Sequence, residues 1–463
     1  MPNAFLGTSH FDREQFAEII LENMLPERVP TEDEPVALLS RRGLVEELEV
    51  TGVGEVEGVF SQDGTLGGDL FTTVLGTLYR ETTSLGAMGV TRVPSFAGGD
   101  DQIVATTGAR LKHYNGTTFS TPTFPDSANV VAVGYLDGRF LAVRENSDRV
   151  YYSAIGDGTS WDGADFIEAE SEPDALRDIR ILNGTAALLG SQTIEFFATT
   201  ANASLPYQRI QLRSYGQGLL NVNACDVVSI GARDSLAFVS ADFGVYLDTE
   251  KVSPPWLDRK IEDVAGAEIL LFGFVLDGHH CFAVSLVTET FVFDTQTGAW
   301  ADFGSSGNKW GAIGSAVHNG LTVFAAAGIA KVVKFGGETE NTDSALDGNT
   351  EFTRTATAII RSDYPFPIDD ITAEMAVGQT TSSTPPTCDM RLSRDQGETW
   401  TSWRSASFGA TGKYRTRATI RRWGMIDAPG AVIQWRYTGN DAAVRPRLSA
   451  IKYNTLAASR DRG

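Results

Sequence analysis

Tight polar turns, each followed by a short alternating apolar strand, recur along the first three quarters of the chain. Asn-Gly and Asp-Gly pairs favour two-residue hairpins, because both residues of such a turn tolerate positive φ angles. The turns are 46, 50, 44 and 42 residues apart and lie at Asp137-Gly138, Asn183-Gly184, Arg233-Asp234, Asp277-Gly278 and Asn319-Gly320. A hairpin repeat of about 40 to 50 residues is typical of four-stranded propeller blades.

Each turn opens a pair of apolar runs. The first runs predict the inner strands of the blades: Phe140–Val143, Ala187–Leu189, Leu236–Val239, Cys281–Val284 and Val323–Ala325. The next runs predict their hairpin partners: Val150–Tyr152, Ile194–Phe197, Val245–Leu247, Phe291–Phe293 and Val332–Phe335. Two weaker copies precede the series, around Gly99-Asp100-Asp101 and Gly68-Asp69. The pattern therefore predicts an all-β fold with a six- or seven-bladed β-propeller over residues 50–340.

A second pattern of strands follows a polar linker at 341–351. Seven short strands without helical periodicity predict a C-terminal β-sandwich over 352–456, before a flexible tail at 457–463. These strands are Thr355–Arg361, Ile371–Val377, Met390–Ser393, Thr399–Arg404, Ala418–Trp423, Val432–Tyr437 and Leu448–Tyr453.

The N-terminal arm, residues 1–49, shows one helical pattern. Phe16, Ile19, Ile20 and Met24 fall on one face at helical spacing. A short helix that ends at Pro26 is therefore predicted within the arm.

The composition is that of a soluble multidomain chain. With 463 residues and 42% apolar residues, it has material for two or three domains. No run approaches the 18 or so apolar residues of a membrane span, and no signal peptide is expected. Cys225, Cys281 and Cys388 lie far apart without CxxC spacing, which favours buried structural thiols. We expect no membrane insertion and assembly in the cytoplasm.

Charge is unevenly distributed along the chain. The net charge is −21, yet residues 352–463 carry 16 Lys plus Arg against 10 Asp plus Glu, a net of +6. The remaining 351 residues therefore carry −27. Such asymmetry indicates that the two parts meet different partners, although an acidic surface that maintains solubility explains it equally well.

One local motif matches a known sequence pattern at every defined position. Ser393, Asp395, Gly397 and Trp400 match the Asp-box pattern S-x-D-x-G-x-x-W. Its Asp binds turn amides, its Gly supplies positive φ and its Trp packs beneath the hairpin, so the motif predicts a structural turn. Asp boxes also recur in sialidases, facing away from the catalytic centre.

The sequence predicts no catalytic, cofactor-binding or metal-binding residues. The five histidines show no HxH or HExxH spacing, and the 59 acidic residues are too numerous to single out a catalytic pair. Residues 157–163 are acidic and glycine-rich, but their spacing departs from a calcium-binding loop and favours a turn.

Basic residues of the C-terminal domain interleave with tryptophans. Arg and Trp dominate protein interface hot spots and also line nucleic-acid grooves. Because the rest of the chain is acidic, we expect docking to an acidic protein surface, such as a neighbouring subunit's propeller, rather than to DNA; solvated strand faces are the plain alternative. The candidate interface residues are Arg415, Arg417, Arg421, Arg422, Trp423, Trp435 and Arg436.

Several segments resemble one known family. They are Ala169–Asp174, Gly190–Phe197, Tyr152–Asp162, Asn23–Glu27 and Arg42–Leu44. Together they resemble the tail-hub or nozzle proteins of short-tailed bacteriophages, which stabilise packaged DNA. None of these motifs is catalytic.

The resemblance implies a structural virion protein, located in the tail and without enzymatic activity. It implies a head-tail connector element: a homohexameric ring below the portal and adaptor rings. Such a ring extends the DNA channel, retains the genome until DNA ejection, and anchors fibres, spikes or a needle. DNA would pass through the lumen without sequence-specific binding, because an acidic wall repels phosphates.

Two other classes stay open. A tail-associated glycan-binding or sialidase-like propeller would account for the Asp box, although only one copy is present. A cellular protein-interaction propeller of the WD or kelch type would carry Trp-Asp or Gly-Gly signatures, which the repeats lack.

Overall fold

The computed structural model describes residues 3–12, 19–28, 36–169, 174–202, 204–305, 307–336, 346–348, 350–378, 380, 384–439 and 444–455. Contacts divide the chain into two compact units. Unit 1 combines Met1–Val45, Glu289–Trp310 and Phe335–Gly463, and unit 2 combines Glu46–Thr288 with Gly311–Lys334. Residues 50–340 thus contribute to both units, and the domain boundaries drawn from the sequence stay a prediction.

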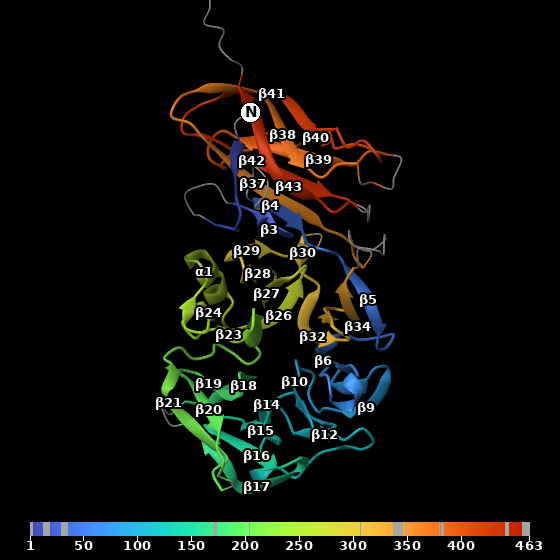
Figure 1. Cartoon of the computed structure of the whole chain (residues 1–463), viewed down its shortest axis with the longest axis vertical. Helices are drawn as coiled ribbons and strands as arrows, with labels where there is room; N and C mark the ends of the chain where they lie inside the picture. The colour runs from blue at the N-terminus through green and yellow to red at the C-terminus, as the bar shows by residue number, and fades with distance from the viewer. Residues whose placement is uncertain are drawn as a thin grey trace, which may run out of the picture. The chain divides into compact units, whose positions relative to one another are not determined.

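The described residues of unit 2 form six four-stranded blades of a β-propeller, which confirms the predicted fold class (Figure 1). The blade strands are β6 (Val56–Phe60), β7 (Phe71–Val74), β8 (Thr77–Arg80) and β9 (Thr83–Ala87); β10 (Ser95–Gly99), β11 (Gln102–Thr106), β12 (Lys112–Tyr114) and β13 (Phe119–Ser120); β14 (Val130–Leu136), β15 (Arg139–Arg144), β16 (Arg149–Ala154) and β17 (Asp157–Glu168); β18 (Leu176–Leu182), β19 (Thr185–Gly190), β20 (Ile194–Thr199) and β21 (Tyr207–Tyr215); β22 (Cys225–Ile230), β23 (Arg233–Val239), β24 (Val245–Leu247) and β25 (Glu250–Lys251); and β32 (Ala312–His318), β33 (Leu321–Ala326), β34 (Lys331–Phe335) and β5 (Leu44–Glu49).

A hairpin takes a further place in the ring of blades. It consists of β26 (Leu270–Leu276) and β27 (His279–Ser285), and β26 lies between β22 and β32. The short helices are η1 (Leu66–Gly68), η2 (Pro125–Ser127) and α1 (Pro255–Asp263). The prediction of six or seven blades therefore holds, with six complete blades and one hairpin in unit 2.

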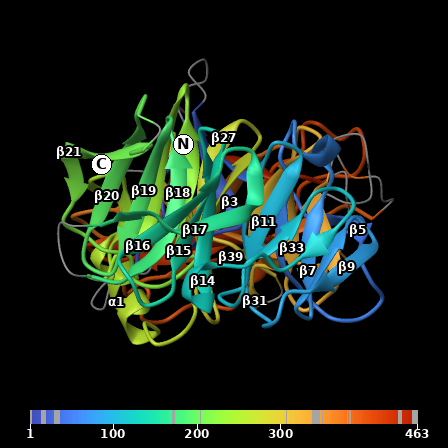
Figure 2. The ribbon, with the colours of Figure 1, turned by 90° about the horizontal axis from the view of Figure 1, so that it is seen from below.

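The second strand of a blade is apolar throughout, because both of its faces are covered. In β15, Phe140 and Ala142 pack into one cluster with Val104 of the preceding blade. Leu141 and Val143 point the other way and pack with Leu188 of the following blade. Successive side chains of a strand alternate between its faces, so an unbroken apolar run marks a strand that is covered on both faces. Figure 2 shows β15 beside β14 and β16 of its blade.

This arrangement corrects the prediction that the apolar runs after the turns are the inner strands. The central cavity, with a volume of about 330 Å³, is lined instead by the first strands, which precede the turns. Gly134 of β14 and Ile181 of β18 are among its lining residues. Continuous apolar character reports burial on both faces of a strand and does not show which strand of a blade is innermost.

Four of the five repeat turns have the predicted geometry. Both residues have positive φ in Asp137-Gly138, Asn183-Gly184, Asp277-Gly278 and Asn319-Gly320. The prediction was wrong for Arg233-Asp234: these residues begin β23, and Ile230 pairs with Arg233 around a turn at 231–232. Gly231 supplies the positive φ there. Gly68-Asp69 likewise lies in a longer loop that begins with η1.

Neighbouring blades are joined by carboxylates of their first strands. Asp178 is fully buried and accepts hydrogen bonds from the N–H groups of Ile179 at 2.7 Å and Asn223 at 3.2 Å. Asp226 repeats this arrangement one blade later and accepts from the N–H of Gly273 at 2.8 Å. Arg180 forms an ion pair with Asp178 at 2.7 Å. These bonds tie backbone groups of successive blades together.

The N-terminal strand β5 closes the ring, because it adds to β34 of the last blade. Ion pairs flank this junction. Lys331 Nζ lies 2.6 Å from Glu46 Oε2, and Lys334 Nζ lies 2.8 Å from Glu47 Oε2. Both ends of the propeller sequence thus meet in one sheet, which leaves no blade without a neighbour.

Unit 1 is a curled β-structure of two sheets joined by β1, which pairs with both β37 and β43. One sheet contains β38, β41, β43, β3 and β4; the other contains β37, β42, β39 and β40. The strands of unit 1 are β1 (Asn3–Leu6), β2 (Leu21–Glu22), β3 (Met24–Arg28), β4 (Val36–Ser40), β28 (Thr290–Asp294), β29 (Ala299–Asp302), β30 (Gly304–Ser305), β31 (Asn308–Lys309), β35 (Leu346–Asp347), β36 (Thr350–Glu351), β37 (Thr353–Arg361), β38 (Phe366–Met375), β39 (Thr387–Ser393), β40 (Arg404–Ser407), β41 (Ala418–Ile426), β42 (Gly430–Thr438) and β43 (Arg447–Thr455).

The helix predicted to end at Pro26 is wrong over the described residues. Ile19 forms a β-bridge with Phe11, and Met24 and Pro26 lie in β3, which pairs with β4. Phe16 lies outside the described residues. Met24 is fully buried in the sheet, so tertiary pairing overrides a helical spacing of only four residues.

Replacing Asp178 by Ala should destabilise unit 2. The change removes the acceptor of two backbone N–H groups and the partner of Arg180, so we expect a loss of about 3 kcal/mol in the free energy of unfolding. Urea denaturation measures this loss. Glu250→Ala, an exposed carboxylate in β25, is the control and should stay within about 0.5 kcal/mol of the wild type. Equal effects of the two changes would contradict the joining role of Asp178.

Candidate functional site

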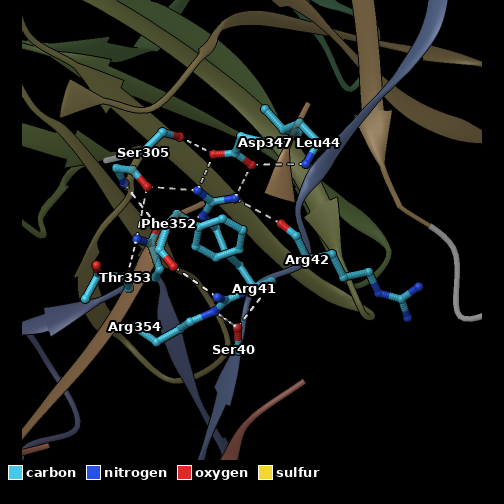
Figure 3. Close-up of polar contacts among 11 residues, drawn as sticks. Ser40, Arg41, Arg42, Leu44, Ser305, Asp347, Phe352, Thr353 and Arg354 are labelled. Atoms are coloured by element: carbon cyan, nitrogen blue, oxygen red, sulfur yellow. Dashed lines mark hydrogen bonds and ion pairs between the residues drawn. The ribbon is translucent and has the colours of Figure 1, made fainter. Parts of the chain in front are cut away.

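A buried ion pair joins Arg41 and Asp347 within unit 1 (Figure 3). The Arg41 guanidinium, whose side chain has 0% exposure, donates to both oxygens of Asp347, Nη1 to Oδ1 at 2.8 Å and Nη2 to Oδ2 at 2.6 Å. Nε donates to Asn23 Oδ1 at 2.6 Å, and Nη2 also donates to the Gly304 carbonyl at 2.9 Å. Arg41 therefore joins segments that lie more than 250 residues apart in sequence.

Phe352 lies between two guanidinium groups (Figure 3). Arg41 Cζ is 3.8 Å from its ring centroid, and Arg354 Cζ is 3.7 Å from it. Arg354 is fully buried, and its Nε donates to Ser40 Oγ at 3.1 Å. Burial, followed by the charge of Arg41, lowers the pKa of Arg354 to about 9. The ring face stabilises both cations where water is excluded.

This cluster holds separate segments of unit 1 together. Its described contacts are structural. Asp347 also accepts from the backbone N–H of Leu44 at 3.0 Å and from the Ser305 hydroxyl. Asn23 and Leu44 come from the two N-terminal segments, Asn23–Glu27 and Arg42–Leu44, that carried the family resemblance. No sequence pattern indicates that they meet Asp347, because only the tertiary fold brings position 347 to them.

Replacing either Arg41 or Asp347 by Ala should cost about 3–5 kcal/mol in the free energy of unfolding, because each change leaves an uncompensated buried charge. Urea denaturation is again the measurement. Lys452→Ala is the matched control, since Lys452 pairs with Glu374 at 2.7 Å with both side chains partly exposed, and its loss should stay below about 1 kcal/mol. Similar losses for the pair and the control would contradict the fastening role.

The Asp-box residues form the predicted structural turn between β39 and β40. Ser393 Oγ donates to Asp395 Oδ1 at 2.7 Å, the Gly397 N–H donates to Ser393 Oγ at 2.7 Å, and the Thr399 N–H donates to Asp395 Oδ1 at 2.8 Å. Gly397 has a φ of 105°. Trp400 packs against the guanidinium of Arg391. The strand predicted at Thr399–Arg404 is therefore wrong: β40 begins at 404, because the turn extends to that residue.

Asp395 should titrate well below an ordinary aspartate. Hydrogen bonds from Thr399, then from Ser393, lower its pKa from 3.8 to about 2. A folded-state pKa below the unfolded value means that the turn is stabilised at pH above the unfolded pKa, and that this stabilisation is lost as pH falls through about 2. Carboxyl-carbon NMR titration measures the midpoint.

Thr399→Val removes the largest cause of that shift, so the midpoint of Asp395 should rise toward its ordinary value. Thr419→Val, in β41 of the same unit, is the control and should leave the midpoint near 2. An unchanged midpoint in the Thr399 variant would contradict this assignment.

A layer of arginine and tryptophan covers the outer side of β39 and β42. Arg391 Cζ lies 4.4 Å from the Trp400 ring centroid and 4.5 Å from that of Trp403, and Arg436 Cζ lies 4.0 Å from Trp403. All four side chains are half-buried. We call these four residues the Arg-Trp surface. It is the strongest candidate interaction site among the described residues.

The candidate interface residues from the sequence are only partly placed at a surface. Trp423 and Trp435 are 3% and 0% exposed, so the prediction that they contribute to an interface was wrong. Alternation along β42 turns the Trp435 indole into the core. In β41 the alternation is interrupted at Arg422, which has a positive φ of 64°, so Trp423 is buried like Ile420. Arg436 belongs to the Arg-Trp surface, and four other candidates are exposed: Arg415, Arg417, Arg421 and Arg422.

Two members of this surface, Arg391 and Trp403, were missed in the sequence. The alternation of the predicted strand could have placed Arg391 on the outer face, because it lies between Met390 and Leu392, which are both buried. Trp403 follows the Asp box by three residues, and the predicted strand at 399–404 hid its place in the turn region.

The remaining chemical groups fit structural roles. All three cysteines are buried thiols that form no disulfide, and burial raises the pKa of the Cys388 thiol to about 12. The turn predicted at 157–163 is wrong, because these residues lie in strand β17, which follows a turn at 155–156; the Thr159 N–H donates to Asp157 Oδ1 at 2.8 Å. Within the described ranges, no group of three or more His, Cys, Asp or Glu is placed to hold a metal ion. None of the described helices is long and apolar enough to cross a membrane.

The fold defines a class: an all-β protein with a β-propeller and a second, curled β-structure. The sequence matches a family model for phage stabilisation, described as "Bacteriophage P22 Gp10, beta-propeller", over residues 5–327. This match covers more than half of the chain, and the chain belongs to that family. The family inferred from the sequence motifs is thereby confirmed. It is a family of structural phage proteins that stabilise packaged DNA, which makes the chain a virion component.

Other comparisons add little. No curated protein matches the chain. A crystal structure of BBS1N in complex with ARL6DN, soaked with lead, aligns at 9% identity and a TM-score of 0.43, covering 65% of this chain and 98% of that one. The same complex soaked with mercury aligns at 11% identity and a TM-score of 0.40, covering 65% and 99%. At these TM-scores neither likeness supports a further conclusion.

Proposed function

We propose that the chain forms the tail hub or nozzle ring of a short-tailed phage. The ring, a homohexamer, lies below the portal and adaptor proteins, extends the DNA channel, retains the packaged genome, and anchors fibres, spikes or a needle. The observation that carries the proposal is the family match over residues 5–327, which includes most of the propeller. The ring assembles in the host cytoplasm and has no enzymatic activity.

The propeller cavity argues for a lumen made by several copies. Its volume of about 330 Å³ is that of a small-molecule pocket. Duplex DNA, whose major groove alone is about 12 Å wide, does not pass through such a space. A DNA channel therefore needs copies arranged around a common axis, with each propeller serving as part of the wall.

The acidic charge fits a channel that contains DNA without binding it. Residues 1–351 carry a net charge of −27. A wall of like charge repels phosphates and lets DNA pass quickly at ejection. A lumen lined mainly by Lys and Arg would contradict this part of the proposal.

A sialidase-like or glycan-binding propeller is the alternative function. Its sequence support was the Asp box, and that motif lies in the sandwich strands of unit 1. Turnover of host polysaccharide, abolished by a single carboxylate substitution, would favour this alternative over the structural role.

Mass and particle shape test the proposal most directly. Light scattering and negative-stain imaging of the purified chain, alone and mixed with its adaptor ring, should show a sixfold annulus. The adaptor ring imaged without the chain is the control for density that belongs to the adaptor. A chain that stays monomeric in both conditions would contradict the tail-hub function.

A further inference from the structure

The Arg-Trp surface is preorganised for a partner. Arg391 Nε donates to Gln434 Oε1 at 2.8 Å, and Arg436 Nε lies 3.0 Å from Asp389 Oδ2. Asp389 is itself held by the Ser405 hydroxyl at 2.6 Å. Because these contacts fix the guanidinium planes before binding, little side-chain entropy is lost when a partner docks.

Core packing does not account for this surface. The inner sides of β39 and β42 are already filled by Met390, Leu392 and Trp435, all with 0% exposure. The Arg-Trp surface lies on the opposite side and keeps an excess of positive charge, with two arginines and one aspartate. Half-buried Trp beside Arg is the composition of interface hot spots. The surface therefore fits a partner rich in carboxylates.

One face of unit 2 supplies such carboxylates. The turns between the first and second strands all lie on the same side of the propeller, because each blade repeats the same strand direction. A hydrogen bond from the Gly156 N–H to the Gly138 carbonyl, at 2.8 Å, shows that the later turn of a blade lies there too. We call this side the turn face, and its acidic residues include Asp100, Asp101, Asp137, Asp234 and Asp277.

Several of these carboxylates are hydrogen-bonded to neutral groups. Asp100 accepts from the Tyr135 hydroxyl at 2.6 Å, Asp101 from the Leu66 N–H at 3.2 Å, and Asp234 from the Ser229 hydroxyl at 2.7 Å. Their negative charge is thus kept. Burial and then Asp100 raise the pKa of Tyr135 to about 12, which is consistent with a negative potential on this face.

We infer that the Arg-Trp surface of one copy binds the turn face of a second copy of this chain. The inference rests on the proposed ring, in which each subunit needs two different complementary patches. Opposite charge selects the pairing and steers association, while the two tryptophans exclude water from the contact.

Charge reversal of each surface tests the contact in the full-length chain. The surface variant is Arg391→Glu/Arg436→Glu. The turn variant combines Asp234→Lys with Asp100→Asn, Asp101→Asn, Asp137→Asn and Asp277→Asn. Asn tolerates the positive φ of 50–54° at these four positions, and the variant changes the charge of the five turn-face residues from −5 to +1. Each variant alone should weaken self-association by at least about tenfold, measured by sedimentation at low salt with and without the adaptor ring.

Mixing the two variants is the decisive step. In a ring, the reversed Arg-Trp surface then meets the reversed turn face, and the two unchanged surfaces also meet. Association should therefore return toward the wild-type level. Failure of the mixture to associate would overturn the inference. Recovery of association when a single variant is mixed with the wild-type chain, in place of the other variant, would also overturn it.

A matched control separates this contact from general charge effects. Arg361→Glu/Lys413→Glu changes the charge of unit 1 equally at exposed basic residues outside the candidate interface and should alter self-association less than about twofold. If the Glu surface variant loses its circular dichroism signal, Arg391→Gln/Arg436→Gln replaces it and should still weaken association. An equal effect of the control and the surface variant would overturn the inference.

The outcomes distinguish this inference from the proposed function. If the wild-type chain forms rings and the surface variant forms them equally well, the assigned contact is refuted while the proposed ring stands. A wild-type chain that never associates, alone or on its adaptor, would refute both.

Discussion

A propeller blade cannot bury its second strand alone, and the rest of unit 2 depends on this constraint. Strand β15 places alternate side chains into clusters shared with the blades on either side. Each blade therefore needs two neighbours, and the first and last blades need each other. The addition of β5 to β34 meets this need, since it joins the beginning and the end of the propeller sequence in one sheet. Closure removes the exposed edges that an open array would present.

In unit 1, the buried ion pair of Arg41 and Asp347 joins strands from separate parts of the chain. Its strands come from three separate stretches of the chain, which must be held in register. Arg41 does so by donating hydrogen bonds to Asp347, Asn23 and Gly304. The Phe352 ring lies against Arg41 and against a second buried guanidinium, that of Arg354. An apolar core would tolerate several packings of these segments, whereas a forked donor set with fixed acceptors accepts one. Specific register is the gain that offsets the cost of desolvating these charges.

Within each unit, these constraints fix the positions of the surface side chains. The propeller fixes a set of acidic turns on one side, and the sandwich fixes the arginines and tryptophans of the Arg-Trp surface on strands β39 and β42.

The sequence alone determined the blade repeat, because turn chemistry and strand alternation are local. Asp137-Gly138 and Asn319-Gly320 adopt the predicted turns, and the motifs around Ala169 and Gly190 identified the family. The Asp box was also readable, since Ser393, Asp395 and Gly397 act within one turn. The tertiary structure alone decided which strands are innermost, because an apolar run reports burial and not direction. It also turned Trp435 inward, made strands of the residues at 19–26, and brought Asp347 to Arg41. Each of these outcomes depends on contacts between residues far apart in sequence, which no local pattern encodes.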